Sequence, residues 1–369
     1  MPNALTERLE AYAQIARTLD VDAIALVPGP NFERVVLHPF SSHERPFLLV
    51  VPADGEPAAL VPNLELGSWN AVGFEGAVFD WRDQDGYAAA FDAMLSHLGI
   101  GSLAVEGQVM RVFVHHALLA AQPGLRVVDA EREISALRLV KTPAEIDALR
   151  AAIDVSERAL ARTLEGVRAG QSEVEIERSL VANLFAEGAD ALAFGPIVAA
   201  GDNSARPHAR ARADYAIVPG DALLLDFGAR VDGFCADITR TVFVGHASDE
   251  AWEVYDTVLR ANRRAFEVAR PWVTAHEVDD AVTGVLEASP YAERIRTKTG
   301  HGLGRDVHEA PYIMRGNRAT LEAGMVFTDE PGLYALGRFG VRIEDDVLVT
   351  GDGCVSLTQF PKDLTVLPC

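Results

Sequence analysis

The chain has 369 residues, of which 49% are hydrophobic and 24% are charged, so it has ample apolar material for buried cores and is not a mainly disordered protein. Because single domains usually contain about 100 to 200 residues, we expect two domains. The formal net charge of −21 argues against nucleic acid as a partner, since affinity for a phosphate backbone comes largely from Lys and Arg.

Cysteine spacing and hydropathy indicate the compartment. The three cysteines, Cys235, Cys354 and Cys369, are far apart and form no C-x-x-C pair, so neither a disulfide framework nor a thiolate zinc site is predicted. The first residues, MPNALTERLEAYAQIARTLD, lack the apolar core of a signal peptide, and no later run approaches the roughly 18 apolar residues of a membrane helix. We expect a cytoplasmic protein with no membrane partner.

Residues 21–129 alternate short apolar runs, among them AIALV, PFLLVVP and LRVVD, with helical patterns such as residues 85–98. This alternation predicts a small α/β domain, which we place at residues 1–133. Within it, the turn-rich segment VPGPNFERVVLHPFSSHERP is expected to form a loop and an edge strand.

The remainder, residues 134–369, begins with two helix-start signals. Thr142, Pro143 and Glu145 form the pattern of a capping box with proline at the first helical position, and the amphipathic helix that they open should end near Gly166. A second capping box, Ser172 with Glu175, starts the next helix.

The same order of elements then recurs. The run DALLLDFGARVDGFCADITRTVFVG predicts a β-hairpin that turns at Asp232-Gly233. A long helix over residues 248–270, a capping box of Thr274 with Glu277, and β-rich runs over residues 325–350 follow it. Two similar helix-helix-hairpin halves therefore predict one layered α+β domain.

Two carboxylates of the hairpin are expected to converge. If Asp232-Gly233 form the turn, Asp226 faces Thr239 and Asp237 faces Gly228, which makes the two aspartates diagonal neighbours on one face. A turn one residue earlier would place them directly opposite each other, again on one face, whereas a bulge would separate them.

Carboxylates in so apolar a run are costly unless a cation offsets their charge. A bound metal is the simplest explanation. The alternative is one exposed aspartate together with a salt bridge from the other to an arginine such as Arg240.

The segment TGHGLGRDVHEAP combines closely spaced glycines with His301, His308 and Glu309. Imidazole is a metal ligand or a general acid or base near neutral pH, and glycine allows a close approach of the backbone. A nucleotide-binding loop is a weak alternative, because the glycine spacing has no strand-to-helix context.

Glu330, in VFTDEPGLY, and Glu344, in GVRIEDDVLV, again place carboxylates within apolar β runs. Arg342 would share the strand face of Glu344 and could orient a carboxylate ligand. Asp345 and Asp346 are expected to be solvated. One imidazole with four carboxylates suits Mn²⁺, Co²⁺ or Zn²⁺, and the charge favours two ions, so that metal-activated water would be the nucleophile.

The ligand candidates resemble, in order, the metal ligands of the M24 metallopeptidases, the "pita-bread" enzymes. The motifs IVAAGDNSARPHA, LLLDFGARVDGFCADITRT, GHGLGRDVHEAP, DEPGLY and GVRIEDDVLVT carry the resemblance over most of residues 134–369. The preceding residues resemble the creatinase-like N-terminal domain of prolidases and Xaa-Pro aminopeptidases. The matching ligand positions are Asp226, Asp237, His301, Glu330 and Glu344.

The resemblance implies a role for each position. Asp237 and Glu344 would bridge two metal ions, Asp226 would bind one ion alone, and His301 and Glu330 would complete the other coordination sphere. His208, in ARPHA, and His308 match histidines that contact the scissile region and stabilise the tetrahedral intermediate, and Glu330 would shuttle the proton. The resemblance favours Mn²⁺, with Co²⁺ or Zn²⁺ as alternatives.

The implied activity is removal of the N-terminal residue from short peptides of the Xaa-Pro type, by attack of a metal-bridging hydroxide on the first peptide bond. An Xaa-Pro dipeptidase (prolidase) shares all of these motifs. Many proline-specific relatives carry an extra histidine where this chain has Thr297, which also leaves a broader specificity open. A non-enzymatic binding module is disfavoured because every ligand position is filled. A homodimer is expected from the family.

Overall fold

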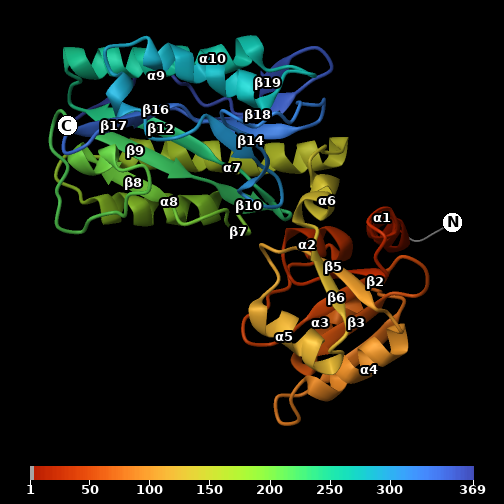
Figure 1. Cartoon of the computed structure of the whole chain (residues 1–369). Helices are drawn as coiled ribbons and strands as arrows, with labels where there is room; N and C mark the ends of the chain where they lie inside the picture. Colours follow the sequence, from red (N-terminus) through yellow and green to blue (C-terminus); the bar gives the residue numbers. More distant parts are fainter. Residues whose placement is uncertain (1–3) are drawn as a thin grey trace. The chain divides into compact units, whose positions relative to one another are not determined.

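The computed structural model describes residues 4–369, and the chain divides into two compact units, Met1–Arg138 and Leu139–Cys369. The first unit contains one six-stranded sheet in the order β4-β3-β2-β1-β5-β6 (Figure 1). Its central strand β1, Ala23–Leu26, is antiparallel to β2 and parallel to β5. Because side chains alternate across a strand, Ile24 and Leu26 enter one hydrophobic core while Ala23 and Ala25 enter the other. The other elements are α1 Ala4–Thr18, α2 Pro30–Val36, β2 Leu48–Pro52, β3 Ala58–Pro62, α3 Leu66–Ala71, β4 Ala77–Trp81, α4 Ala88–Leu98, β5 Ser102–Val105, α5 Val112–Ala121, β6 Arg126–Asp129 and α6 Glu131–Ser135.

The expected loop and edge strand around Pro30 are wrong, because this segment contains helix α2. Pro30 occupies the first helical turn, where its missing N–H removes no helical hydrogen bond, so a residue that suggested a turn in fact starts a helix. The helix is fixed by burial: the Asn31 amide donates to Glu106 at 2.6 Å, and the Phe32 ring lies 5.1 Å from that of Phe47.

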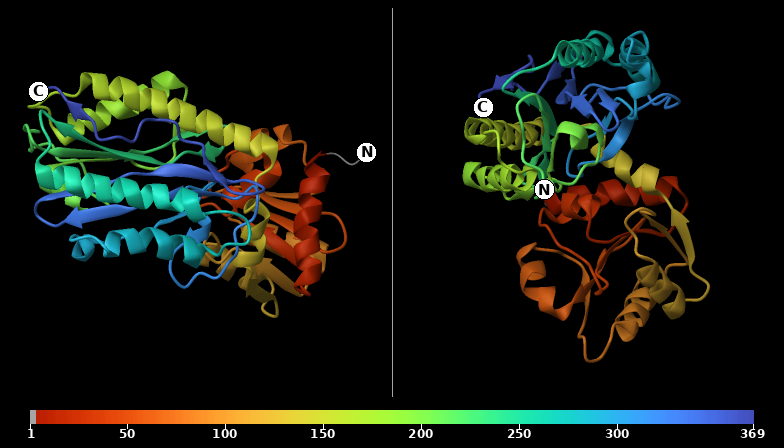
Figure 2. Two further views of the ribbon diagram at one scale, coloured as in Figure 1. Left: turned by 90° about the horizontal axis from the view of Figure 1, so that it is seen from above. Right: turned by 90° about the vertical axis from the view of Figure 1, so that its left-hand side faces the viewer.

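The second unit has the predicted duplicated order. Its strands lie between the helix pair α7 and α8 and the helix pair α9 and α10 (Figures 1 and 2). The three predicted capping boxes are present, at Thr142, Ser172 and Thr274, and each capping hydroxyl accepts from the N–H three residues later. The helices are α7 Pro143–Gly166, α8 Glu173–Glu187, α9 Asp249–Val268 and α10 Ala275–Glu287.

The strands of this unit form two larger sheets, ordered β20-β12-β9-β8 and β14-β13-β15-β18-β19, with the smaller groups β11-β10-β7 and β16-β17 beside them. The main hydrophobic core of α9 and α10 packs on strands of the second sheet, and that of α7 and α8 packs on the first. The strands are β7 Ala191–Leu192, β8 Ile197–Ala200, β9 Ala222–Phe227, β10 Ala229–Val231, β11 Phe234–Cys235, β12 Ile238–Val244, β13 Gly300–Gly302, β14 Glu309–Ile313, β15 Val326–Asp329, β16 Gly332–Ala335, β17 Phe339–Arg342, β18 Asp345–Val349, β19 Cys354–Ser356 and β20 Val366–Leu367.

The predicted hairpin register is confirmed. Asp226 of β9 pairs with Thr239 of β12, and Asp232 and Gly233 form the turn with positive φ angles of 50° and 79°. The two arms approach very closely at Gly228, where a Cβ atom would lie 1.7 Å from the carbonyl oxygen of Ala236. A residue with a side chain would push the arms apart at the point where both aspartates project.

Within residues 4–369, no helix combines the length and the apolar character needed to cross a membrane.

The close approach of the hairpin arms at Gly228 predicts the effect of a substitution there. Gly228→Ala should destabilise the protein by about 3 kcal/mol, because the new methyl group overlaps backbone that cannot move without breaking the hairpin. Gly284→Ala is the matched control, since a Cβ there, in the last turn of α10, meets nothing within 4 Å. We expect it to stabilise by about 0.5 to 1 kcal/mol. Urea unfolding of both variants checks the contrast, and equal stabilities would contradict it.

Candidate metal centre

Three carboxylates converge at the centre of the second unit. One oxygen each of Asp226, Asp237 and Glu344 lie within 4.8 Å of one another, and all three residues are buried. Asp226 projects from β9 and Asp237 directly precedes β12, as the hairpin register predicted. Glu344 comes from the other half of the unit, between β17 and β18, and its N–H donates to the carbonyl of Thr239 at 3.1 Å. The two halves are therefore joined at the ligand positions.

His301 and Glu330 complete the cluster from the second sheet. His301 Nε2 lies 3.4 Å from Glu330 Oε1 and 3.6 Å from Asp237 Oδ2. His301, Glu330 and Glu344 form a second group of atoms within 4.8 Å of one another. The structure thus brings together all five ligand candidates.

The His301 ring is oriented for coordination through Nε2. Its Nδ1 lies 3.1 Å from the carbonyl oxygen of Gly302, so an Nδ1–H that donates there leaves the Nε2 lone pair facing the carboxylates. Burial, followed by the neighbouring His308, lowers the pKa of His301 to about 3. The imidazole is neutral at physiological pH, as a metal ligand must be.

The carboxylates are held in an unfavourable electrostatic environment. Burial raises the pKa of Glu330 to about 7, and it raises the pKa of Asp237 and of Glu344 well above the ordinary values, with repulsion between the acids adding to the effect. Among residues 4–369, Asp226 Oδ1 has no hydrogen-bond partner although it is buried. Oxygen ligands of high negative charge with one imidazole fit divalent cations, which would relieve both features.

Arg342 is the positive group of the cluster, and it reaches Asp226. Its Nη2 donates to Asp226 Oδ2, and its Nε donates to Thr239 Oγ1 at 3.0 Å. The Thr239 hydroxyl in turn donates to Glu344 Oε2 at 2.5 Å, and Arg342 Nη1 donates to the Tyr334 hydroxyl at 2.8 Å.

Thr239 and Tyr334 were not predicted. Thr239 could have been found, because it faces Asp226 in the hairpin register. Tyr334 lies on β16, the strand that pairs with the β17 strand of Arg342, and is its diagonal neighbour on one face, so the register of that hairpin could also have indicated it.

Asp345 and Asp346 were expected to be solvated, and this expectation is wrong because both are buried. Asp345 forms ion pairs with Arg240 at 2.8 Å and Lys362 at 2.6 Å, so Arg240 does not serve the hairpin aspartates. Asp346 accepts the N–H of Asp237 at 3.2 Å. The strand β18 lies inside the layered unit, where both of its faces are covered.

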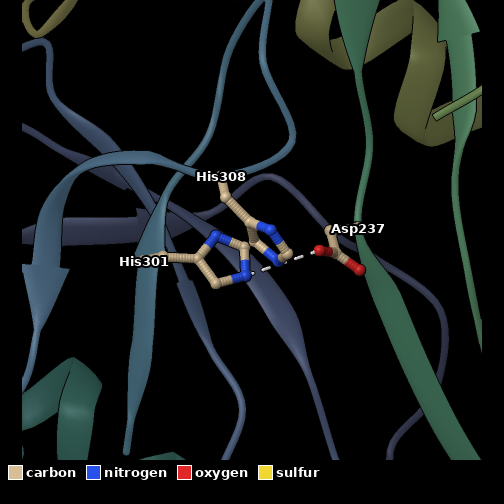
Figure 3. A group of neighbouring side chains, drawn as sticks. All are labelled: Asp237, His301 and His308. Atoms are coloured by element: carbon tan, nitrogen blue, oxygen red, sulfur yellow. Dashed lines mark ion pairs between the residues drawn. The ribbon is translucent and has the colours of Figure 1, made fainter. Parts of the chain in front are cut away.

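The two histidines assigned to substrate are exposed. The His308 ring lies edge-on to His301 with centroids 4.2 Å apart, and both rings face the Asp237 carboxylate in Figure 3. Burial lowers the pKa of His308, and the charges of Lys298 and His208 act in the same direction. His208 follows the 3₁₀ helix η3, Gly201–Ala205, which places it in electrostatic range of His308 but outside the ligand groups.

The remaining residues of the glycine-rich segment serve packing. Glu309 forms a buried ion pair with Lys141 at 2.7 Å. A Cβ at Gly300 would lie 1.8 Å from the carbonyl oxygen of Thr328, and one at Gly302 would lie 2.0 Å from that of Ala310. These glycines allow close strand contacts in the sheet that carries His301.

Duplicated helix-hairpin halves around an imidazole and four carboxylates, three of them buried and that of Glu330 half-buried, define the class of metal-dependent hydrolases with the pita-bread fold. The sequence model of metallopeptidase family M24 matches residues 147–351, and that of the Creatinase/Prolidase N-terminal domain matches residues 8–140. The chain belongs to metallopeptidase family M24, which confirms the fold class and the resemblance.

Individual relatives match along the whole chain. The probable dipeptidase PepE of Mycobacterium tuberculosis is 36% identical and is covered over 97% of each chain. The structure of the prolidase from Thermococcus sibiricus superposes with a TM-score of 0.94 at 33% identity and covers 100% of both chains. The X-Pro aminopeptidase of Thermotoga maritima gives a TM-score of 0.83 at 30% identity, covering 96% of this chain and 99% of that one.

The raised pKa of Glu330 predicts a pH-dependent stability difference between the metal-free wild type and Glu330→Gln. The ordinary pKa is 4.5 and the folded one about 7, so the folded wild type keeps a proton that the unfolded chain loses between these values. Wild-type stability relative to the glutamine variant should thus fall as the pH rises through this window and then level off. Thermal unfolding in EDTA from about pH 5 to about pH 8 measures the difference; a pH-independent difference would contradict it.

Proposed function

We propose that this protein is a two-metal peptidase that removes the N-terminal residue from short peptides of the Xaa-Pro type. The observation that carries the proposal is the overlap of the ligand groups. Asp237, Glu344 and His301 each belong to two groups of converging ligand atoms, whereas Asp226 and Glu330 belong to one. A carboxylate has two oxygens that can bind two ions, whereas His301 offers only Nε2, because its Nδ1 faces the carbonyl of Gly302. Asp237 and Glu344 would therefore be the ligands shared between two ions, and Asp226, His301 and Glu330 would complete the site.

Two divalent ions at this centre, Mn²⁺ first and Co²⁺ or Zn²⁺ as alternatives, would supply Lewis acidity and a water of lowered pKa. The chain's own groups would do the rest. Glu330, which lies 3.4 Å from His301 at the edge of the cluster, would take and return the proton of the attacking water. Arg342 holds the Asp226 carboxylate in a fixed orientation.

The exposed histidines would act on the peptide. His308 projects beside the ligand cluster and would donate to the carbonyl oxygen as it gains negative charge, while His208 would contact the scissile region. The free N-terminal amine of the substrate would bind among the carboxylates. A cytoplasmic location agrees with three free cysteines, and we propose a homodimer as the working assembly.

An Xaa-Pro dipeptidase (prolidase) is the second candidate. The names of two relatives favour it, because the M. tuberculosis protein is called a probable dipeptidase and the T. sibiricus protein a prolidase. Thr297, half-buried and four residues before His301, stands where many proline-specific relatives carry a histidine. Its hydroxyl is a weaker partner for a substrate, so the preference for proline should be relaxed.

Metal-free protein reconstituted with Mn²⁺, Co²⁺ or Zn²⁺ tests these candidates on Ala-Pro, Ala-Pro-Ala and Ala-Ala-Ala. We expect release of the N-terminal alanine from the proline peptides, fastest with Mn²⁺. Cleavage of Ala-Pro alone would identify a dipeptidase, and comparable cleavage of Ala-Ala-Ala would show relaxed specificity. No cleavage with any metal would contradict the proposal.

Paired substitutions separate metal binding from catalysis. Asp237→Asn should lose at least one metal ion together with activity, because a bridging charge is removed. His308→Ala should retain both ions while turnover falls roughly a hundredfold, as for loss of one donor to a developing oxyanion. Metal analysis beside steady-state kinetics measures both. A fully active Asp237→Asn or an unimpaired His308→Ala would remove that residue from its role.

A further inference from the structure

His208 lies on a segment that leaves the sheet between two strands. This His208 segment, residues 200–212, starts at the last residue of β8, forms η3 and passes His208 before the chain returns to β9. His208 is exposed, so its position depends on how the segment is anchored.

One fully buried carboxylate anchors both ends of the segment. Glu173 is the first residue of α8, and its oxygens accept the N–H of Ala200 at 2.8 Å and the N–H of Arg212 at 2.6 Å. The side-chain amide of Asn203, in the middle of η3, donates to the same carboxylate at 2.9 Å. Every one of these donors belongs to the His208 segment.

The side chain of Arg212 also binds Glu173, and it links the end of the His208 segment to its start. Its guanidinium donates to Glu173 Oε1 at 2.9 Å, to Asp202 Oδ1 at 2.8 Å and to the carbonyl oxygen of Ala200 at 2.9 Å. The guanidinium carbon also lies 4.1 Å from the centroid of the Tyr215 ring. A planar, forked donor is needed for these simultaneous contacts, and lysine could not make them all.

The anchored segment contacts the strand that carries Arg342. The N–H of Gly340 donates to the Ser204 hydroxyl at 2.9 Å, and Arg342 Nη1 lies 3.5 Å from the carbonyl oxygen of Pro207, directly before His208. The segment is therefore held against β17 on one side and by Glu173 on the other.

A buried carboxylate is stable only while its hydrogen bonds are made, since an unpaired charge in the interior is costly. Movement of the segment would separate Glu173 from several donors at once. We propose that Glu173 and Arg212 are positioning residues that hold His208 at the substrate. This inference rests on the role of His208 in the proposed function.

Helix α8 supplies its own control. Glu187, its last residue, has a carboxylate that is only 7% exposed and pairs with Arg158 at 2.7 Å and Arg162 at 2.5 Å. It has the same chemistry at the opposite end of the same helix, but its partners lie on α7. Glu187→Gln should lower the melting temperature without changing kcat/KM.

The experiment is a double-mutant cycle with the metal-loaded, full-length protein and the best peptide of the assay above. Arg212→Met and Glu173→Gln should each lower kcat/KM roughly ten- to a hundredfold, because a displacement of about 1 Å at a contact residue costs that much. Their metal content should equal that of the wild type. In a His208→Ala background, the same substitutions should cost less than about threefold, because the residue they position is gone.

The alternatives give different results. Equal losses in both backgrounds, or no loss in the wild type, would overturn the positioning role. A His208→Ala variant with full activity would instead overturn the role of His208 in the proposed function, and this inference with it. Should Arg212→Met fail to fold, the Glu173→Gln pair gives the same comparison, because glutamine preserves the shape of the side chain.

Discussion

Mutual repulsion among buried acids is the constraint on which the second unit depends. Four carboxylates lie within reach of one another, and the pKa values of three of them are raised by burial and by their neighbours. Of the residues that the structure describes, 4–369, Arg342 is the one Lys or Arg that forms an ion pair with these carboxylates. A fold that keeps such a centre rigid must position the acids from many strands, since any one flexible ligand would turn outward to water. The four are Asp226, Asp237, Glu330 and Glu344.

The duplicated architecture meets this requirement. Each half contributes one of the two larger sheets with a helix pair packed on it, and the candidate ligands come from both sheets, such as Asp226 on β9 and His301 on β13. The joints between the halves are hydrogen bonds at the ligands themselves: Glu344 donates its N–H to Thr239, and Asp237 donates its N–H to Asp346. Displacement of one half relative to the other would therefore move the ligand set and break backbone bonds in the interior, which couples the integrity of the centre to that of the core.

Local signals predicted most of this arrangement. Capping boxes located the helices, and the Asp232-Gly233 turn together with the two-residue period fixed which aspartates share a face. The wrong predictions concern residues whose burial depends on partners that are distant in the sequence. Asp345 and Asp346 look like a solvated pair in sequence, but their partners Arg240 and Asp237 are more than a hundred residues away. The Glu173–Arg212 anchor, 39 residues apart, likewise has no local signature.

The candidate metal ligands and the residues proposed to contact the peptide lie in different parts of the fold. The ligands and Arg342 are buried or nearly so and are set by strand register, which tolerates little change. His208, His308, Thr297 and Lys298 occupy connecting segments and are half-buried or exposed. In the proposed function, a change at His208, His308 or Thr297 would alter what contacts the peptide without disturbing the charge balance of the centre. The threonine at position 297 is of this kind. Selectivity for the second residue of the substrate can therefore vary on an unchanged metal centre, provided that the segments carrying the contact residues are firmly anchored to the helices behind them.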